Sequence, residues 1–225
     1  METDYAGHDR AYQRKRVDPD YAGWTRHDEV VGDWHNTWQP LSQKQAFPDQ
    51  GNLLELGCGA GNLGIAFAQV GYTVTGVDIA LTAIAWAVEN AAKANVKVNF
   101  LQGDVLTLTE IEDDSFDIAL DGRCFHCIIG CDRTQFLHTA HRILKPNGVL
   151  TITTMCNQVP VSLQPNFDPQ TRCIVHKDVA TRYIGDSNDI LQEIIQADFQ
   201  ILDVEVVPPS SEDDAADLQV IATKR

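Results

Sequence analysis

One short segment restricts the fold of this chain more than any other, a glycine-rich turn between an apolar stretch and a helical pattern. Residues 53–62 read Leu-Leu-Glu-Leu-Gly-Cys-Gly-Ala-Gly-Asn, and apolar residues at helical spacing follow over 63–70. Glycines at such a junction let the backbone approach a ligand closely, because no Cβ is in the way. A dinucleotide-binding Gly-x-Gly-x-x-Gly pattern starting at Gly57 would place its third glycine at Asn62, whereas this chain has Gly61. The turn predicts a nucleotide-binding unit that departs from the dinucleotide pattern.

Strand-like and helix-like segments alternate along the chain. The pattern consists of apolar runs at 53–56, 73–77, 96–101, 116–120 and 149–153, separated by helical patterns at 63–70, 80–93 and 132–144. Such alternation predicts parallel strands covered on both faces by helices. Two final strands, expected at 200–207 and 217–223, are joined only by an acidic loop and should be antiparallel. We predict a Rossmann-like, doubly wound α/β sheet of seven strands, mostly parallel with one antiparallel strand at the C-terminal end.

The chain length indicates a single domain. With 225 residues, of which 44% are hydrophobic, the chain can bury one core and is shorter than the roughly 250–300 residues at which chains usually divide. We expect residues 1–50 to be a helical or lid segment of the same domain and residues 51–225 to be the main domain. Residues 155–185, which include three prolines, are expected to be a substrate-loop insertion. A last helix is expected at 187–197, with Ser187 as its N-cap.

Charge and hydropathy restrict partners and location. The 32 acidic and 17 basic side chains give a net charge of −15, which repels phosphate backbones and disfavours DNA or RNA as a partner. No apolar run reaches the ~18 residues of a membrane span, and the polar N-terminus lacks the apolar centre of a signal peptide. We therefore expect a cytoplasmic protein without nucleic-acid or membrane partners, either a monomer or a homodimer.

Two carboxylates follow the next two strands. Asp78 ends the second strand, before Ile79, and Asp104 precedes Val105 after the third strand. A carboxylate at the first position can accept both ribose hydroxyls of an adenosine ligand, and one at the second lies where the adenine amino group would be. Each aspartate alone could be a helix cap or a turn residue. In register with the glycine turn, the pair indicates an adenosine-containing ligand, either NAD or S-adenosylmethionine.

As a set, these motifs resemble those of the class I S-adenosylmethionine-dependent methyltransferases. The resemblance rests on segments 55–61, 77–78, 103–104 and 144–148 and covers residues 50–225, with Asn147 and Asp198 standing where glycine is usual. It implies that S-adenosylmethionine is the cofactor. It further implies that the cofactor contacts are Glu55, Gly57, Cys58, Gly59, Gly61, Asp78, Ile79, Asp104, Val105 and Asp121.

The acceptor is expected beyond the carboxyl ends of the strands, near segments 121–132 and 155–185. In the first segment, Phe125-His126-Cys127 resembles an apolar-His-His pair found in many small-molecule methyltransferases. We expect His126 to orient or deprotonate the acceptor and Asp121 to face the sulfonium. A histidine that only packs under the cofactor is the alternative.

Further acceptor contacts are expected from Trp24, Trp38, Arg123, Cys124, Cys127, Met155 and Arg172. Arginine forks at 123, 172 and 182 suit an anionic substrate group. The thiols could bind a soft metalloid, as in arsenite methyltransferases, or pack as small hydrophobes. One Cys-x-x-Cys pair does not make a structural zinc site, so no metal is expected. The tryptophans at 24, 34 and 38 could form a lid or the packing face of a helix.

We predict an enzyme that transfers a methyl group from S-adenosylmethionine to an O, N or S atom of a small molecule by direct displacement. Methylation of thiol-bound arsenite is one alternative. A nicotinamide-dependent oxidoreductase is another, which Asn62 and the closing antiparallel strands disfavour. A non-catalytic S-adenosylmethionine-binding subunit is the third.

Overall fold

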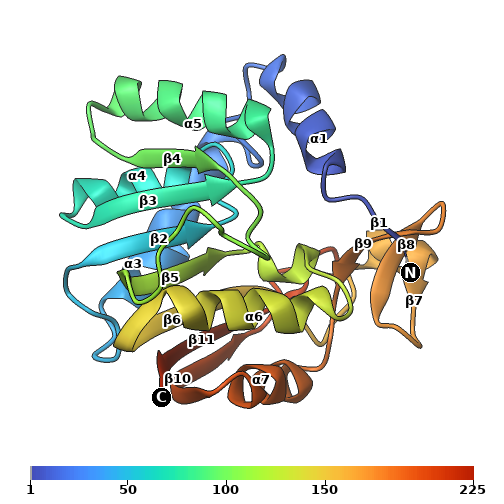
Figure 1. Ribbon diagram of the computed structural model, residues 1–225. Coiled ribbons are helices and arrows are strands. Elements are labelled where there is room, and N and C mark those ends of the chain that lie inside the picture. Colours follow the sequence, from blue (N-terminus) through green and yellow to red (C-terminus); the bar gives the residue numbers. More distant parts are fainter. Residues whose placement is uncertain (1) are drawn as a thin grey trace.

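The computed structural model describes residues 2–225 and is built around one seven-stranded sheet (Figure 1). Its strand order is β10-β11-β6-β5-β2-β3-β4. The strands are β2 (Asn52–Leu56), β3 (Thr73–Asp78), β4 (Asn99–Gln102), β5 (Phe116–Gly122), β6 (Leu144–Cys156), β10 (Phe199–Val207) and β11 (Ala216–Lys224). Strand β11 is antiparallel to both β6 and β10, while the other neighbouring pairs are parallel. The predicted mostly parallel sheet with one antiparallel strand is confirmed.

Helices cover both faces of the sheet. One face carries α3 (Gln39–Ser42), α4 (Asn62–Gln69) and α5 (Leu81–Ala94), and the other carries α6 (Asp132–Ile143) and α7 (Ser187–Gln196) (Figure 1). Side chains alternate along β2, so Leu53 joins the apolar cluster of Phe67 on α4, while Leu54 joins that of Phe136 on α6. The near-continuous apolar strands of the sequence thus belong to a sheet that is buried on both faces.

Several element boundaries differ from the sequence expectation by a few residues, and two of these differences follow from identifiable contacts. Helix α7 is capped by Asp186, whose Oδ1 accepts a hydrogen bond of 2.9 Å from the amide of Asn188, whereas Ser187 was expected as the cap. Asp186 has the extended backbone conformation that an N-cap requires. Strand β6 begins at Leu144, which pairs with Phe116, and therefore includes the segment 145–148 that was expected to precede it.

Residues 155–185 form more than a loop. They contain β7 (Phe167–Asp168), β8 (Cys173–His176) and β9 (Val179–Tyr183), and β1 (Glu2–Thr3) completes a small sheet in the order β1-β9-β8-β7. Strands β8 and β9 are joined through Lys177 and Asp178, both of which have positive φ angles of 49° and 69°. A two-residue hairpin with two positive φ angles is usually signalled by Asn-Gly or Asp-Gly. The absence of that signal from the sequence explains why the hairpin was missed.

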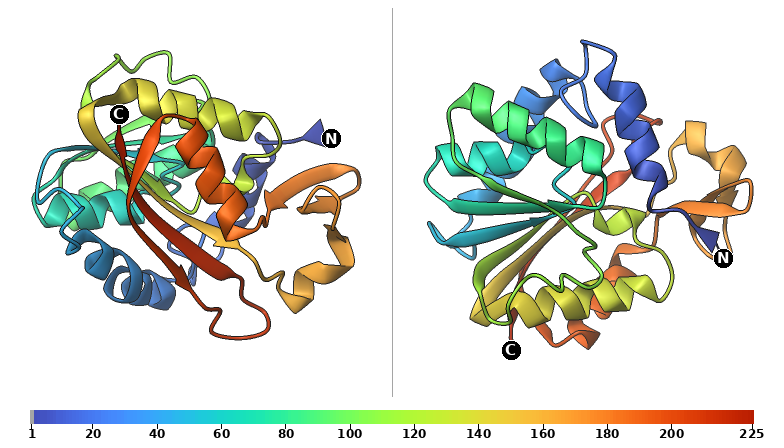
Figure 2. Two further views of the ribbon diagram at one scale, coloured as in Figure 1. Left: turned by 90° about the horizontal axis from the view of Figure 1, so that it is seen from below. Right: turned by 45° about the horizontal axis from the view of Figure 1, so that its top comes forward.

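The N-terminal segment crosses the carboxyl edge of the large sheet. It contains α1 (Gly7–Arg16), α2 (His27–Asp33) and a π-helix at Trp34–Trp38. Helix α1 lies beside α5 near the ends of the strands (Figure 2), and Tyr12 shares an apolar cluster with Trp86 of α5. Within residues 2–225, no helix is long and apolar enough to cross a bilayer.

Candidate active site

A large cavity of about 760 Å³ lies at the carboxyl edge of the parallel strands, where open α/β sheets bind their ligands. The glycine turn after β2, the ends of β3 and β5 and the β10–β11 loop contribute to its wall. The N-terminal segment covers it with Tyr5, His8, Tyr12, Trp24, Thr25, Gly32, Asp33, Asn36, Thr37 and Trp38.

The cavity brings together most of the residues that the sequence predicts for the site. For the cofactor these are Glu55, Gly57, Cys58, Gly59, Asp78, Ile79, Asp104 and Val105. For the acceptor they are Trp24, Trp38, Arg123, Cys124, His126, Cys127 and Met155. Three predicted residues, Gly61, Asp121 and Arg172, are not among the lining residues.

Glycine is required at two positions of the turn. Gly59 has a φ angle of 53°, and a Cβ there would collide with the hydroxyl of Tyr12. Gly61 has a φ angle of 77°, and its Cβ would lie 2.5 Å from the ring of Phe100. Gly59 therefore allows α1 to approach the turn, while Gly61 allows the turn to pack on β4 instead of lining the cavity.

Asp78, which ends β3, and Asp104, which follows β4, each accept hydrogen bonds from nearby backbone amides and also line the cavity. The oxygens of Asp78 accept hydrogen bonds of 2.8 Å from the amides of Gly59 and Ala80. Oδ1 of Asp104 accepts one of 2.9 Å from the amide of Leu106. The two roles weighed for each aspartate, turn residue and ligand contact, are therefore compatible in this structure.

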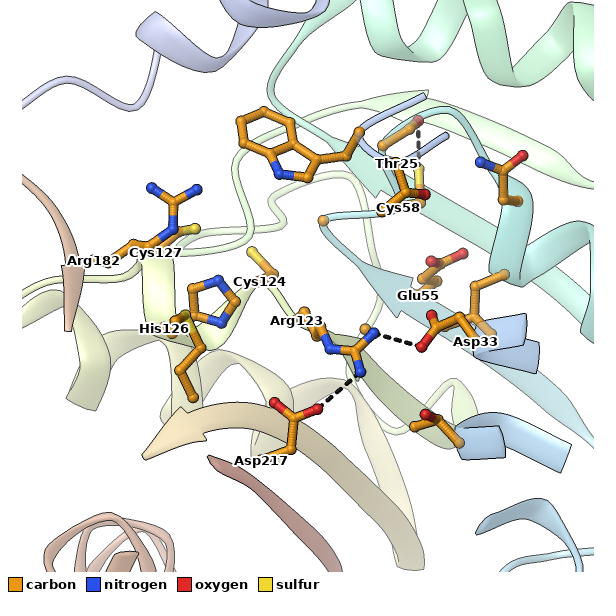
Figure 3. Close-up of a pocket in the computed structure, with 18 of the residues that line it drawn as sticks. Thr25, Asp33, Glu55, Cys58, Arg123, Cys124, His126, Cys127, Arg182 and Asp217 are labelled. Carbon is orange, nitrogen blue, oxygen red and sulfur yellow. Dashed lines mark hydrogen bonds and ion pairs between the residues drawn. The ribbon is translucent and has the colours of Figure 1, made fainter. Parts of the chain in front are cut away.

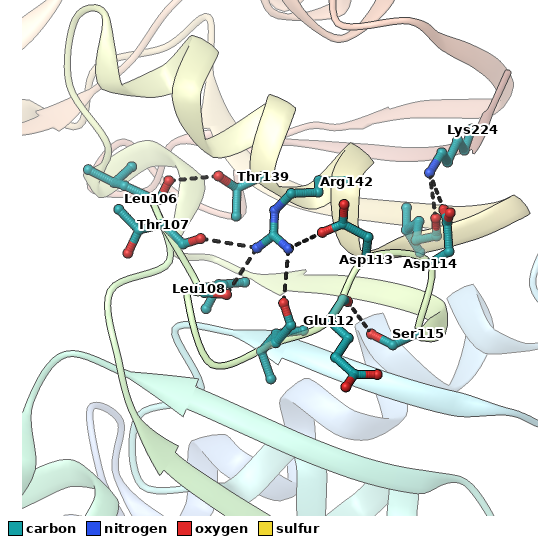
Figure 4. Close-up of polar contacts among 12 residues, drawn as sticks. Leu106, Thr107, Leu108, Glu112, Asp113, Asp114, Ser115, Thr139, Arg142 and Lys224 are labelled. Atoms are coloured by element: carbon teal, nitrogen blue, oxygen red, sulfur yellow. Dashed lines mark hydrogen bonds and ion pairs between the residues drawn. The ribbon is translucent and has the colours of Figure 1, made fainter.

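The loop that carries Asp104 is fixed on α6 (Figure 4). The guanidinium of Arg142 donates to the carbonyls of Thr107, Leu108 and Ile111 at 2.9–3.1 Å. The hydroxyl of Thr139 donates to the carbonyl of Leu106 at 2.6 Å. These bonds satisfy the backbone of a connection that contains no helix, so the cavity wall at Asp104 is held in one conformation.

Two buried carboxyl groups, Glu55 and Asp121, form no ion pair among the described residues. Burial raises the pKa of Glu55 to about 8 and that of Asp121 to about 7. Oε2 of Glu55 has no hydrogen-bond partner among the described residues. Oδ1 of Asp121 accepts 2.8 Å bonds from the amides of Cys124 and Phe125, and its side chain is fully buried. Asp121 therefore positions the turn that carries His126, and its expected place at the sulfonium is not what the structure shows.

Replacing Glu55 with glutamine should change how stability depends on pH. In the unfolded chain this carboxyl ionises near its ordinary pKa of 4.5, whereas the folded, ligand-free protein keeps it protonated to about pH 8. Its stabilising contribution is therefore complete below pH 4.5 and is lost as the pH rises toward 8. We expect the melting temperature of Glu55→Gln, relative to that of the wild type, to rise as the pH increases from 4.5 to 8. The control is Glu110→Gln at an exposed position, and a gain that does not vary with pH would contradict the prediction.

His126 lies at the other end of the cavity, on the short helix Phe125–Cys127 (Figure 3). Its side chain is 7% exposed, and Nδ1 has no partner among the described residues. Burial, together with the positive charges of Arg182 and Arg123, lowers its pKa well below the ordinary value. His126 is therefore neutral at neutral pH and can accept a hydrogen bond or a proton.

The cysteines do not gather into one site. Cys58, Cys124 and Cys127 line the cavity, while Cys156 and Cys173 are buried outside its lining. Burial raises the pKa of Cys127 to about 11 and that of Cys124 well above its ordinary value, so both remain thiols at neutral pH. Within residues 2–225, no group of three His, Cys, Asp or Glu side chains is placed to hold a metal ion.

Arg123 was expected to bind an anionic substrate group, but both arms of its guanidinium are occupied. They donate to Oδ1 of Asp33 at 2.6 Å and to Oδ2 of Asp217 at 2.8 Å (Figure 3). These partners lie on α2 and β11. Arg123 therefore ties the N-terminal cover to the sheet. Arg172 donates to the carbonyl of Ile184 and does not reach the cavity, so neither arginine is placed to bind the acceptor.

Removing Arg123 should weaken the protein as a whole. Arg123→Leu leaves Asp33 and Asp217 without their shared cation, and these side chains are 34% and 21% exposed. We expect a loss of about 2 kcal/mol in the free energy of unfolding, below the ~3–5 kcal/mol of a fully buried pair, measured by urea denaturation. Arg26→Leu, at an exposed ion pair, is the control and should cost much less, because solvent screens such pairs. Equal losses of unfolding free energy in the two variants would show that Arg123 does not hold the N-terminal segment on the sheet.

Sequence reasoning missed several lining residues, including Tyr5, Tyr12 and Pro208–Pro209. The proline pair could have been found, because β10 is parallel to β2 and its carboxyl end must lie on the same edge of the sheet. The hydroxyl of Tyr5 donates to Oδ2 of Asp132 at 2.7 Å. No sequence spacing indicates this contact between residues so far apart.

A family model described as "Methyltransferase domain" matches residues 48–198. The chain belongs to the S-adenosylmethionine-dependent methyltransferases. Its family membership excludes the nicotinamide-dependent alternative.

Individual relatives agree with this family. The ubiquinone biosynthesis O-methyltransferase of Methylobacterium nodulans is 33% identical over 104 residues, which are 46% of this chain and 41% of that protein. The match therefore spans about two fifths of the curated relative. The PH0226 protein of Pyrococcus horikoshii has a similar fold, with a TM-score of 0.72 and 20% identity over 95% of this chain and 99% of that chain. The 1,6-didemethyltoxoflavin-N1-methyltransferase of Burkholderia thailandensis, solved with S-adenosylhomocysteine, has a TM-score of 0.63 and 20% identity over 88% and 86% of the two chains.

The glycine-turn end of this methyltransferase fits S-adenosylmethionine. The cofactor carries a positive sulfonium and an ammonium group, and the wall here holds the carboxyl groups of Glu55, Asp78 and Asp104. The unpartnered Oε2 of Glu55 is an acceptor without a donor, and a cationic ligand would favour its ionised form. Gly57 and Gly59 let Cys124 and Tyr12 approach the turn, so these two side chains also border the cofactor end of the cavity.

A methyl group added at Gly59 should weaken cofactor binding. Gly59→Ala introduces a Cβ against the Tyr12 hydroxyl at a position with positive φ, so the turn must shift. We expect the affinity for S-adenosylhomocysteine, measured by calorimetry, to fall by about tenfold or more. Gly71→Ala controls for backbone strain alone, because Gly71 has a φ angle of 107° and nothing within 4 Å of a Cβ. Combining Gly59→Ala with Tyr12→Phe should restore part of the affinity, and equal affinities of the two alanine variants would contradict the prediction.

Proposed function

We propose that this protein transfers the methyl group of S-adenosylmethionine to an O, N or S atom of a small molecule by direct displacement. The observation that carries this proposal is a single cavity that connects the acidic glycine turn with the neutral, unpartnered His126. When bound, the cofactor supplies a methyl group on a positively charged sulfur, which is already activated toward a nucleophile. The remaining tasks of the protein are alignment and exclusion of water.

Residues of this chain are suited to those tasks. The imidazole of the neutral His126, which lines the cavity, can accept the hydrogen bond of an acceptor O–H, N–H or S–H and take its proton as the new bond to carbon forms. Trp24 and Trp38 line the cavity from the N-terminal segment, which supports a lid that shields the reaction from water. The net charge of −15 supports a small molecule over a nucleic acid as acceptor.

Methylation of arsenite is a second candidate, favoured by the presence of Cys124 and Cys127 in the cavity wall. Soft metalloids bind thiolates, whereas burial keeps these two groups protonated at neutral pH. Cys58 also lines the cavity, but burial keeps its thiol protonated as well, and among the described residues no three ligating side chains are placed together to hold a metal ion. The chemistry of the wall therefore supports an organic acceptor more strongly than a metalloid.

Loss of His126 should separate catalysis from cofactor binding. With acceptors screened by S-adenosylhomocysteine release, we expect His126→Ala to lower kcat by about 10²–10⁴-fold and to leave the affinity for S-adenosylhomocysteine unchanged. His138→Ala, at an exposed position of α6, is the matched control and should keep wild-type turnover. Failure of S-adenosylmethionine and S-adenosylhomocysteine to raise the melting temperature would refute the proposed function. Wild-type turnover by His126→Ala would refute the role of His126.

A further inference from the structure

Arg182 presents an arginine without an acidic partner to the cavity. It belongs to β9 of the small sheet and lines the cavity near Cys127 and His126 (Figure 3). Among the side chains that the structure describes, no carboxylate forms an ion pair or hydrogen bond with its guanidinium. Its neighbour is the ring of Trp24, with 5.9 Å between the guanidinium carbon and the ring centroid.

This isolation is not explained by a shortage of acids. The chain has 32 acidic and 17 basic side chains. Carboxylates pair with Arg10, Arg16, Arg26, Arg123, Arg133 and Arg142. A half-buried cation at a cavity wall loses part of its hydration, and an anionic ligand would compensate for that loss.

The two imidazoles beside Arg182 carry no charge. Burial and the charge of Arg182 lower the pKa values of His8 and His126, so both imidazoles are neutral at neutral pH. His8 packs against Trp24, with 5.7 Å between ring centroids. Lys15 also packs on the Trp24 ring, with 5.3 Å between its ammonium and the ring centroid, but it lies outside the cavity lining. Arg182 is therefore the cation of the lining that remains for a bound anion, because Arg123 is paired with Asp33 and Asp217.

The charges of the cavity are separated. Glu55 lies on the opposite side of the cavity from Arg182 (Figure 3), and the charge of Asp78 is close enough to Glu55 to help raise the pKa of Glu55. Asp33 and Asp217 are already bound by Arg123. The wall is acidic where the positive groups of the cofactor fit and cationic at the end beyond His126.

We propose that the methyl acceptor is a small carboxylic acid whose carboxylate pairs with Arg182, an assignment that rests on the methyl transfer proposed above. The guanidinium offers two parallel N–H donors that match a carboxylate. Trp24 offers an apolar surface for the body of the acceptor. One unpaired guanidinium beside neutral imidazoles balances a single negative charge, which favours a carboxylate over a phosphate dianion. The nucleophilic atom of the acceptor then lies toward His126.

Binding of small acids tests this assignment without turnover. The probes are acetate, benzoate and phenylacetate, each compared with its uncharged amide, together with phenyl phosphate. Calorimetry is run with and without saturating S-adenosylhomocysteine. We expect at least one acid to bind wild-type protein about tenfold or more tightly than its amide. Arg182→Gln should abolish that preference and Arg182→Lys should keep part of it, while both variants retain the wild-type melting temperature.

Arg172→Gln is the matched control. Arg172 immediately precedes β8 in the small sheet but donates to the Ile184 carbonyl outside the cavity lining, so this variant should keep the wild-type preference for acids. The assignment is overturned if no acid binds wild-type protein more tightly than its amide, or if Arg182→Gln keeps the preference. It is also overturned if phenyl phosphate binds more tightly than every carboxylate through Arg182.

The two proposals fail in different ways. If S-adenosylhomocysteine does not bind while acids still bind through Arg182, methyl transfer is wrong and the anion site stands. If S-adenosylhomocysteine binds but acids show no dependence on Arg182, the cofactor site stands and the carboxylic acid is wrong.

Discussion

Burial of carboxyl groups at the carboxyl edge of the sheet is the constraint on which the rest of this structure depends. A buried carboxylate without a cation is costly unless hydrogen-bond donors surround it. The amides of Gly59 and Ala80 serve Asp78, and those of Cys124 and Phe125 serve Asp121. These four bonds shape the two turns at the base of the cavity. The same turns that satisfy the carboxyl groups therefore also build the ligand site.

Not every buried carboxyl oxygen has a hydrogen-bond donor, and the oxygens without one point to a ligand. Oε2 of Glu55 and Oδ2 of Asp121 have no partner among the described residues, and burial raises both pKa values. Natural proteins commonly break rules of polar satisfaction at functional sites and compensate elsewhere. A cationic cofactor bound near Glu55 would compensate here and would stabilise the folded state by mass action. At the other end of the cavity, Arg182 is a cation without an acidic partner among the described side chains. The separated charges would therefore orient the proposed cofactor and the proposed acceptor.

Local pattern and one topological rule were enough to predict the sheet, the glycine turn, Asp78 and Asp104. Parallel strands present their carboxyl ends on one edge, so residues that end different strands must meet there. The same rule placed Asp121 at the edge but could not tell a lining side chain from one beneath the surface. It also could not choose between Asp186 and Ser187 as the cap of α7, because both are good caps and the backbone conformation decides. The small sheet was missed because Lys177 and Asp178 do not signal a tight hairpin.

The sequence by itself determined the fold class, the family resemblance and the cofactor end of the site, because each depends on periodicity and short spacing. Only the tertiary structure decided which arginine is available to an acceptor. Arg123 is neutralised by Asp33 and Asp217, which lie 90 and 94 residues away in the chain, whereas Arg182 lines the same cavity without an acidic partner among the described side chains. Such pairing depends on how the N-terminal segment, β11 and the small sheet are packed together. Charge pairing between distant segments leaves no periodic trace in a sequence, so it could be found only in the folded protein.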